Sequence, residues 1–423
     1  MKVDTAMEYT RETYLSKLVS NMNSNQVKVI TGIRRCGKSY LLNTLFKRYL
    51  LNSNVPKDHI VQMDFDGFRN KQFRDPATFL SFIDGYITDD SQYYLLLDEV
   101  QLLDEFAEVL NDLIRMDNVD IFVTGSNAHL LTKDVITEFR GRGTEIPMRP
   151  LSFLEFMEGF KGDRRDGYEE YSMYGGLPIV TQLKSPKEKS EYLENVYEET
   201  YIRDIVERNG IRNANDFEDI VNVLCSNIGC LTNPTKISNT FKSVKKSGIS
   251  RATTENYISY LEDSFLFEKA VRFDVKGRRH IGADAKYYAS DLGLRNARMN
   301  FRQYEQTHVL ENVIYNELRS RGYGVDVGVV PAQCKGKDGK IKRANFEIDF
   351  VCNSGSQRYY VQSAFALPTR EKVEQEQASL VRVNDYFKKI IITKDGPAPY
   401  HNEEGILLLN VYDFLLNPKA LEL

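Results

Sequence analysis

One segment of eight residues constrains the fold of this chain more than any other. Residues 32–39 read GIRRCGKS and fit the pattern G-x-x-x-x-G-K-S. An apolar run, VKVITG, leads into the segment, and a helix-forming stretch, SYLLNTLFKRYLL, follows it. The glycines let the backbone curl so that N–H groups point at an anion, and the helix N-terminus adds partial positive charge. A strand, this loop and a helix in that order predict a phosphate-binding loop.

The side chains of the loop have separate roles in binding a nucleoside triphosphate. Lys38 is expected to reach the β- and γ-phosphates, and the Ser39 hydroxyl is expected to hold Mg²⁺. ATP and Mg²⁺ are therefore the expected ligands. The residues expected to bind the nucleotide are Gly32, Ile33, Arg34, Arg35, Cys36, Gly37, Lys38, Ser39 and Tyr40.

A second apolar run ends in two acidic residues. YYLLL at 93–97 is followed by Asp98 and Glu99. A buried strand of this kind delivers Asp98 to the carboxyl edge of a sheet, where it can hold Mg²⁺, and Glu99 can polarise the attacking water. The alternative is a strand that ends in two solvated acids. The phosphate loop upstream favours the catalytic interpretation.

Apolar runs in the first 150 residues predict a parallel sheet. They lie at 27–32, 59–65, 93–99, 121–126 and, more weakly, 144–148. Continuous apolar runs separated by helical stretches are typical of buried parallel strands with helices on both faces. The run at 59–65 lies between the two motifs in the sequence. This suggests one strand inserted between them, as in the additional-strand class of P-loop proteins.

Composition excludes several classes of protein. The 423 residues are 42% hydrophobic and 27% charged, and the formal net charge of -4 excludes a uniformly basic nucleic-acid coat but allows a local basic face. Five scattered cysteines lack zinc spacing and fit a reducing compartment. The start of the chain lacks the apolar core of a signal peptide, and no run approaches the roughly 20 apolar residues of a membrane span. We therefore expect a cytoplasmic protein that does not enter a membrane.

Beyond these motifs, nearly the whole chain resembles a prokaryotic family of AAA+ ATPases whose members carry a C-terminal domain of unknown function. The segments that carry the resemblance are VKVITGIRRCGKSYLL, LLLDEVQ, VTGSN, FRGR, RPLSFLEF, YGGLP, YIRDI, KYYASDLGLRNA, LENVIYNELRSRGY and EIDFV. The resemblance implies an α/β P-loop ATPase of the AAA+ additional-strand class. A helical lid, a winged helix and a PD-(D/E)XK nuclease-like α/β domain would follow it. The expected boundaries are 1–155, 156–233, 234–299 and 300–423.

The resemblance also implies roles for residues after the fourth strand. AAA+ proteins hold a polar residue, sensor 1, near the γ-phosphate and the water; we expect Asn127 there, with Ser126 as the alternative. Arg142 or Arg140 could act as an arginine finger in a neighbouring subunit's site, or both could form a solvated basic turn. Gly176-Leu177-Pro178 resembles the G-x-P element of signalling STAND ATPases, which would place Pro178 near the adenine, although a plain helix-breaking turn fits equally well.

The middle of the chain has an uneven charge balance. Residues 234–281 hold ten basic residues against five acidic ones. Their pattern predicts two helices, the second containing 253–267 with Ser250 or Thr253 as its cap, and then a hairpin over 271–282. A helix before a basic hairpin is what a DNA-binding winged helix presents, although a winged helix used only for packing fits the same pattern. The residues expected to contact DNA are Lys245, Lys246, Arg251, Lys276, Arg278 and Arg279.

The last part of the chain has the expected nuclease-like elements but lacks part of the chemistry. Glu311 lies on a predicted helix and Asp349 on the predicted strand FEIDF, where carboxylates can hold Mg²⁺. The next strand should carry Glu-x-Lys, but it reads Gln362-Ser363-Ala364. We therefore expect a degenerate nuclease site, formed by Glu311, Asp349, Gln362 and Ala364, without nuclease activity.

Together these features predict an ATP hydrolase that drives or switches the binding of a partner. The expected partners are DNA, duplex or branched, a protein, or further copies of the chain in a homo-oligomer. Two other classes stay open: an ATP-coupled nuclease, and a nucleotide-gated interaction protein of the STAND kind with little turnover. A cleavage assay distinguishes the ATP-coupled nuclease from the ATP-driven switch. A steady-state ATPase measurement distinguishes the nucleotide-gated interaction protein from it.

Overall fold

The computed structural model describes residues 8–126, 142–244, 249–302, 305–335 and 341–423. The chain divides into two compact units. The first unit is Met1–Pro150 with Asp263–Phe265, and the second is Leu151–Glu262 with Leu266–Leu423. No helix within the described ranges is both long enough and apolar enough to cross a membrane. The finer division into four domains stays a prediction.

A parallel sheet forms the centre of the first unit. Its described strands are β1 (Val27–Thr31), β2 (Ile60–Asp64), β3 (Tyr93–Asp98), β4 (Val119–Thr124) and β5 (Gly143–Pro147), in the order β2-β3-β4-β1-β5. All neighbours pair in parallel, as the continuous apolar runs predicted. The strand inserted between β1 and β3 is β4, whereas the run at 59–65 forms the edge strand β2. Position along the chain therefore does not give position in the sheet.

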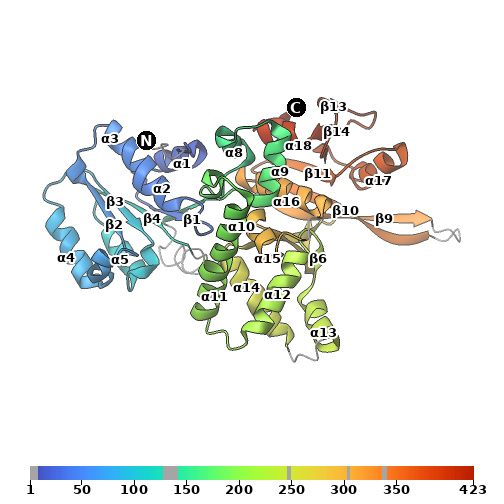
Figure 1. Cartoon of the computed structure of the whole chain (residues 1–423). Coiled ribbons are helices and arrows are strands. Elements are labelled where there is room, and N and C mark those ends of the chain that lie inside the picture. Colours follow the sequence, from blue (N-terminus) through green and yellow to red (C-terminus); the bar gives the residue numbers. More distant parts are fainter. Residues whose placement is uncertain (1–7, 127–141, 245–248, 303–304, 336–340) are drawn as a thin grey trace. The chain divides into compact units, whose positions relative to one another are not determined.

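Helices cover both faces of this sheet (Figure 1). One side carries α4 (Pro76–Tyr86) and α5 (Phe106–Leu113); the other carries α1 (Glu12–Ser20) and a continuous helical segment from Lys38 to Asn52. That segment is made of α2 (Lys38–Tyr40), a π-helical stretch (Leu41–Phe46) and α3 (Lys47–Asn52). Short 3-10 helices lie at Lys57–His59, Phe68–Arg74 and Val100–Leu102. Because both faces are covered, β1, β3 and β4 are buried along their whole length, which is why their sequences do not alternate. The edge strands β2 and β5 are partly exposed.

The second unit is rich in helices. They are α8 (Phe153–Gly159), α9 (Arg164–Tyr174), α10 (Pro186–Asn195), α11 (Arg203–Arg208), α12 (Ala214–Ser226), α13 (Pro234–Val244), α14 (Arg251–Asp263), α15 (Leu292–Arg298), α16 (Gln306–Ser320), α17 (Arg370–Val381) and α18 (Val411–Leu416). A π-helical stretch, Val196–Ile202, joins α10 to α11, and 3-10 helices lie at Val180–Gln182 and Ala420–Glu422.

The boundaries of α14 test one sequence prediction. Ser250 caps this helix, because its hydroxyl oxygen accepts a hydrogen bond of 3.0 Å from the Thr253 N–H. The sequence predicted that this helix would continue to Phe267, but it ends at Asp263. Phe265 has φ of 59°, a left-handed conformation that breaks the helix, and the chain enters a strand at Phe267.

A long mixed sheet runs through the second unit. Its described strands are β6 (Leu231–Thr232), β7 (Phe267–Asp274), β8 (Arg279–Ala289), β9 (Gly324–Lys335), β10 (Ile341–Ser354), β11 (Gln357–Ala364), β12 (Lys388–Thr393), β13 (Tyr400–His401) and β14 (Leu407–Asn410). They are ordered β13-β14-β12-β11-β10-β9-β7-β8-β6. β7 and β8 form the predicted hairpin, and β9 and β10 extend as a ribbon (orange in Figure 1). Because β7 also pairs in parallel with β9, the boundary expected at residue 300 falls within one continuous sheet.

Candidate nucleotide-binding site

The phosphate loop joins β1 to α2 and depends on its two motif glycines. Gly32 has φ of 138° and Gly37 has φ of 103°, values that side chains rarely tolerate. A Cβ atom at Gly32 would also lie 2.0 Å from the Met148 carbonyl oxygen. Backbone conformation and close packing therefore both require glycine at position 32.

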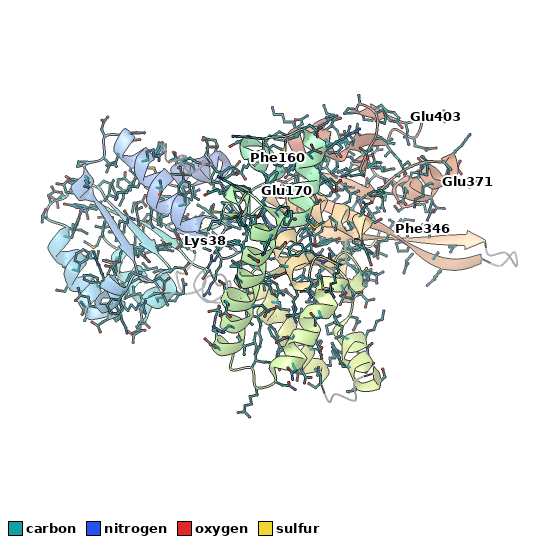
Figure 2. The ribbon with its side chains drawn as sticks, in the orientation of Figure 1. Lys38, Phe160, Glu170, Phe346, Glu371 and Glu403 are labelled. Carbon is teal, nitrogen blue, oxygen red and sulfur yellow. The ribbon has the colours of Figure 1, made fainter. Side chains whose placement is uncertain are left out.

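The side chains of the loop divide into inward and outward sets. Ile33 and Cys36 are buried, so they can offer a ligand only their backbone N–H groups. Ser39 is exposed at the start of α2, and Arg34 donates a hydrogen bond of 3.4 Å to the Ser126 hydroxyl. Lys38, labelled in Figure 2, donates to the carbonyls of Gly32 at 2.9 Å and Ile33 at 3.1 Å. Its ammonium group thus lies against the backbone of the loop.

Asp98 ends β3 as a buried carboxylate. Its side chain accepts hydrogen bonds from the Thr124 hydroxyl and, at 3.2 Å, from the Asn43 amide. Burial raises the pKa of Asp98, and the charges of Glu99 and Asp64 raise it further, while hydrogen bonds from Thr124 and Ser39 work in the opposite direction. A carboxylate destabilised in this way gains from a nearby cation. The hard oxygen donors of Asp98 and Ser39 therefore fit Mg²⁺.

Glu99 follows in a left-handed conformation, with φ of 52°. Its N–H donates to the Thr124 hydroxyl oxygen at 2.9 Å, and its carboxylate accepts from the Ser126 hydroxyl at 3.0 Å and from the Gln101 amide. Thr124 therefore bonds both to Asp98 and to the backbone of Glu99. The sequence prediction missed Thr124, Asn43 and Gln101. For Thr124 the available signal was a threonine at the end of β4, two residues before Ser126.

The candidate sensor and finger residues are described only in part. Asn127 and Arg140 lie outside the described residues, whereas the alternative sensor, Ser126, is buried beside Glu99. Arg142 is exposed immediately before β5, and its carbonyl accepts from the Val27 N–H at 2.8 Å. This is the amino end of β1, one strand length or about 16 Å from the loop at its carboxyl end. A finger role for Arg142 in a neighbouring subunit stays a prediction.

Pro178 belongs to the second unit, where it follows a tightly packed turn. Gly175 has φ of 76°, and the N–H of Gly176 donates to the carboxylate of Asp291 at 2.8 Å. Leu177 is buried, and Pro178 is half-buried. The proposed contact of Pro178 with adenine stays a prediction.

The candidate DNA-binding residues also lie in the second unit. Lys245 and Lys246 are outside the described residues. Arg251 is exposed and pairs with Glu255 at 2.8 Å. Three further cations gather at the exposed turn of the β7–β8 hairpin, where Lys276 also donates to the Pro331 carbonyl at 2.9 Å. These three are Lys276, Arg278 and Arg279.

A groove of about 740 Å³ lies beside α14 and the hairpin. Its lining includes the cations Arg251 and Lys269 and the imidazole of His280, but also the acids Glu255, Glu262 and Asp284. The acids would repel phosphate, so the groove is a poor surface for a DNA backbone. The hairpin turn is the more basic of the two surfaces: it presents three cations, and its one acid, Asp274, accepts hydrogen bonds from the N–H groups of Lys276 and Gly277 at 3.1 and 2.8 Å.

The nuclease-like residues come together around a lysine that the sequence prediction missed. Glu311 and Asp349 both bond to the Lys286 ammonium group, at 2.8 and 3.2 Å, and Glu347 bonds to it at 2.9 Å. Gln362 accepts from the Asp349 N–H at 3.3 Å, and Ala364 is buried in the core. The signal for Lys286 was a lysine in the otherwise apolar strand AKYYAS.

Comparison with known proteins places the chain in a family. A curated protein of Haemophilus influenzae, described as "Uncharacterized protein", is 33% identical over 416 residues, which are 96% of this chain and 98% of that protein. The chain belongs to the same family. A second relative, "Uncharacterized protein MJ1544" of Methanocaldococcus jannaschii, is 28% identical over 405 residues, which are 92% of this chain and 85% of that protein.

Two family models match parts of the chain. Residues 24–157 match an AAA domain, and residues 165–305 match a domain of unknown function, DUF8612. The phosphate loop and Asp98-Glu99 both lie within the segment that matches the AAA domain. Among solved structures, AMPPCP-bound DnaA from Aquifex aeolicus is similar at a TM-score of 0.30, with 14% identity, covering 60% of this chain and 88% of that chain. A similarity at this level supports no statement about function.

Proposed function

We propose that this protein binds ATP with Mg²⁺ and hydrolyses it, and that the nucleotide state controls binding of DNA by the second unit. One observation carries the first part of the proposal. The phosphate loop follows β1, Asp98 ends β3 and Glu99 comes directly after it. In the sheet these two strands are separated only by β4, whose terminal Thr124 bonds to both acidic residues. Parallel strands bring their carboxyl ends to the same edge, which is where open α/β sheets bind ligands.

Each group at this edge has a distinct task in the proposed reaction. The N–H groups of the loop bind phosphate oxygens, and Lys38 exchanges its two carbonyl partners for the β- and γ-phosphates. Ser39 and Asp98 would hold Mg²⁺, which would offset the negative charge of the phosphates. Glu99, oriented by Ser126 and Gln101, polarises the attacking water.

Steady-state ATP hydrolysis by the purified protein tests this proposal. We expect Lys38→Ala to abolish both the binding of a fluorescent ATP analogue and turnover. Lys47→Ala is the matched control, because Lys47 begins α3 on the same helical segment but bonds at the surface to Gln62, at 2.6 Å. Wild-type protein that does not bind ATP would sink the proposal. Binding without turnover would favour the nucleotide-gated alternative of the STAND kind.

DNA is the partner favoured by the exposed cations at 276–279 and by the local excess of basic residues. The test is fluorescence anisotropy with duplex, single-stranded and branched DNA, each measured with and without ATP. We expect binding that changes with the nucleotide. Equal and negligible affinity for all three DNA forms, in either nucleotide state, would leave a protein as the partner.

A further inference from the structure

A row of flat side chains connects the β7–β8 hairpin to the turn that follows α17. The His280 ring, near the start of β8, lies edge-on to Phe273 of β7, with ring centres 5.6 Å apart. The Arg358 guanidinium group, from β11, lies 5.2 Å from the ring centre of Phe273 and 5.4 Å from that of Phe387. Phe387 follows α17 and is 39% exposed. We call these four side chains the aromatic row.

A second stack lies on the same side of the sheet. Arg382, directly after α17, lies over the ring of Phe346 on β10, 4.1 Å from the ring centre, and Phe346 is labelled in Figure 2. Phe346 and Phe273 both pack against the core cluster that contains Leu380 of α17. Both stacks therefore lie on the side of the sheet against which α17 packs.

The turn after α17 presents a second aromatic ring beside Phe387. Tyr386 is fully exposed. The turn itself is fixed by Asp385, whose carboxylate accepts hydrogen bonds from the Phe387 N–H at 3.2 Å and from the Tyr360 hydroxyl at 2.6 Å. Hydration of a bare aromatic face costs free energy that a flat partner would recover. The turn therefore holds two neighbouring rings ready for stacking.

Cations accompany these rings. The hairpin turn at one end of the aromatic row presents the three exposed cations of 276–279, and Arg382 is exposed near the other end. The acids of the two turns, Asp274 and Asp385, accept hydrogen bonds from backbone N–H groups of their own turns, which disperse part of their negative charge. The surface therefore combines positive charge with accessible aromatic faces.

We propose that this surface binds single-stranded DNA, with bases stacked on Tyr386 and Phe387 and phosphates held by the hairpin cations. The inference rests on the proposed DNA partner and specifies its form. In a duplex each base is covered by its neighbours, so an aromatic side chain reaches few base faces. An unpaired base has a free face that stacks on any aromatic ring. Cations alone would bind either form of DNA through phosphate, so it is the rings that favour the single strand.

Fluorescence anisotropy of the full-length protein with a labelled oligo(dT) and with a duplex of the same length tests the inference. We expect Tyr386→Ala to weaken oligo(dT) binding by ~5- to 100-fold, because one stacking partner is lost. Its affinity for the duplex and its salt dependence should match those of wild type, because no charge is removed. Tyr386→Phe keeps the ring and should bind as wild type.

Tyr400→Ala is the matched control. Tyr400 is also an exposed tyrosine of the second unit, but it lies on the edge strand β13 and outside the aromatic row. We expect this variant to bind both forms of DNA as wild type does. A loss of oligo(dT) binding equal to that of Tyr386→Ala would contradict a specific role for Tyr386.

Three further results would overturn the inference. An unchanged affinity of Tyr386→Ala for oligo(dT) would show that no base stacks on this ring. An equal loss of duplex binding would remove the preference for the single strand. Wild-type protein that binds neither form would leave a protein as the partner of this surface. The proposed function fails separately: oligo(dT) binding that depends on Tyr386 but not on ATP would support the inference and contradict control by the nucleotide.

Discussion

Asp291 offers a quantitative test of how burial affects a single carboxylate. It is 3% exposed, and its oxygens accept hydrogen bonds from the N–H groups of Gly176 at 2.8 Å and Leu294 at 3.0 Å. A Cβ atom on Gly175 would lie 2.2 Å from one of these oxygens. Asp291 thereby ties the turn at Gly175-Gly176 to the first turn of α15. The perturbation is Asp291→Asn, which has similar shape but does not titrate.

The sign and size of the effect follow from the pKa. Burial raises the pKa of Asp291 to about 6, and hydrogen bonds from Gly176, Leu294 and Gly293 offset part of the rise. In an unfolded chain the same group has a pKa of about 3.9. The folded protein therefore binds the proton more tightly, so this contribution to stability is present below the unfolded pKa and is lost as pH rises through the folded pKa. A shift of about two units is worth roughly 3 kcal/mol, of which ~2 kcal/mol is lost between ~pH 4.5 and ~pH 7.

Hydrogen exchange measured by mass spectrometry reports the effect locally. Peptides spanning 171–178 and 289–298 should open more easily as pH rises in the wild type, after correction for the pH dependence of chemical exchange. In Asp291→Asn the free energy of local opening should not depend on pH. It should be lower by a constant ~1–3 kcal/mol, because the new amide N–H group faces a backbone N–H that has lost its acceptor. The reasoning is refuted if the difference between wild type and variant is the same, within ~0.5 kcal/mol, at both ends of the pH range.

Four further outcomes are expected. Glu99→Gln should retain ATP binding and slow hydrolysis by ~100-fold or more, since only the water-polarising charge is lost; an unchanged rate would remove that role. Mixing Arg142→Ala with Lys38→Ala protein should restore some ATPase activity if Arg142 completes a neighbouring site, and folded mixtures without rescue at any ratio would exclude this. Alanine at the three cations of 276–279 should weaken DNA binding and flatten its salt dependence, whereas an unchanged affinity would contradict the hairpin contact. Linear, supercoiled and branched DNA should stay intact in Mg²⁺ or Mn²⁺; cleavage that disappears in Asp349→Ala would reverse this expectation.

The sequence located the parts of the candidate nucleotide site that are contiguous along the chain. The phosphate loop and Asp98-Glu99 each form a short motif at the end of an apolar run, so a pattern of residues was sufficient. Thr124 and Asn43 were missed because they reach Asp98 from β4 and from the helical segment after the loop. That Thr124 bonds to Asp98 can be inferred only when the order of the strands in the sheet is known.

The second unit was harder to predict, and for a related reason. The helix and hairpin at 251–289 are local structures, and the sequence located both, apart from the left-handed residue Phe265 that ends α14. The pairing of β7 with β9 joins residues more than fifty positions apart. Lys286 and Glu347 meet only because of that sheet. The sequence prediction looked for the missing charged groups only after Asp349, and it therefore overlooked Lys286 and Glu347.

The parallel pairing of β7 with β9 restricts how the chain can be shortened. Arg272 pairs with Val327, and the pairing extends to Asp274 with Val329. The Val275 N–H extends the ladder by donating to the Val329 carbonyl at 3.0 Å. A fragment that stopped at residue 299 would keep the hairpin but expose this edge of β7 as a row of unsatisfied N–H and C=O groups. Such an edge recruits strands from other molecules and leads to aggregation. The basic turn and the residues from 324 onward therefore have to be produced together.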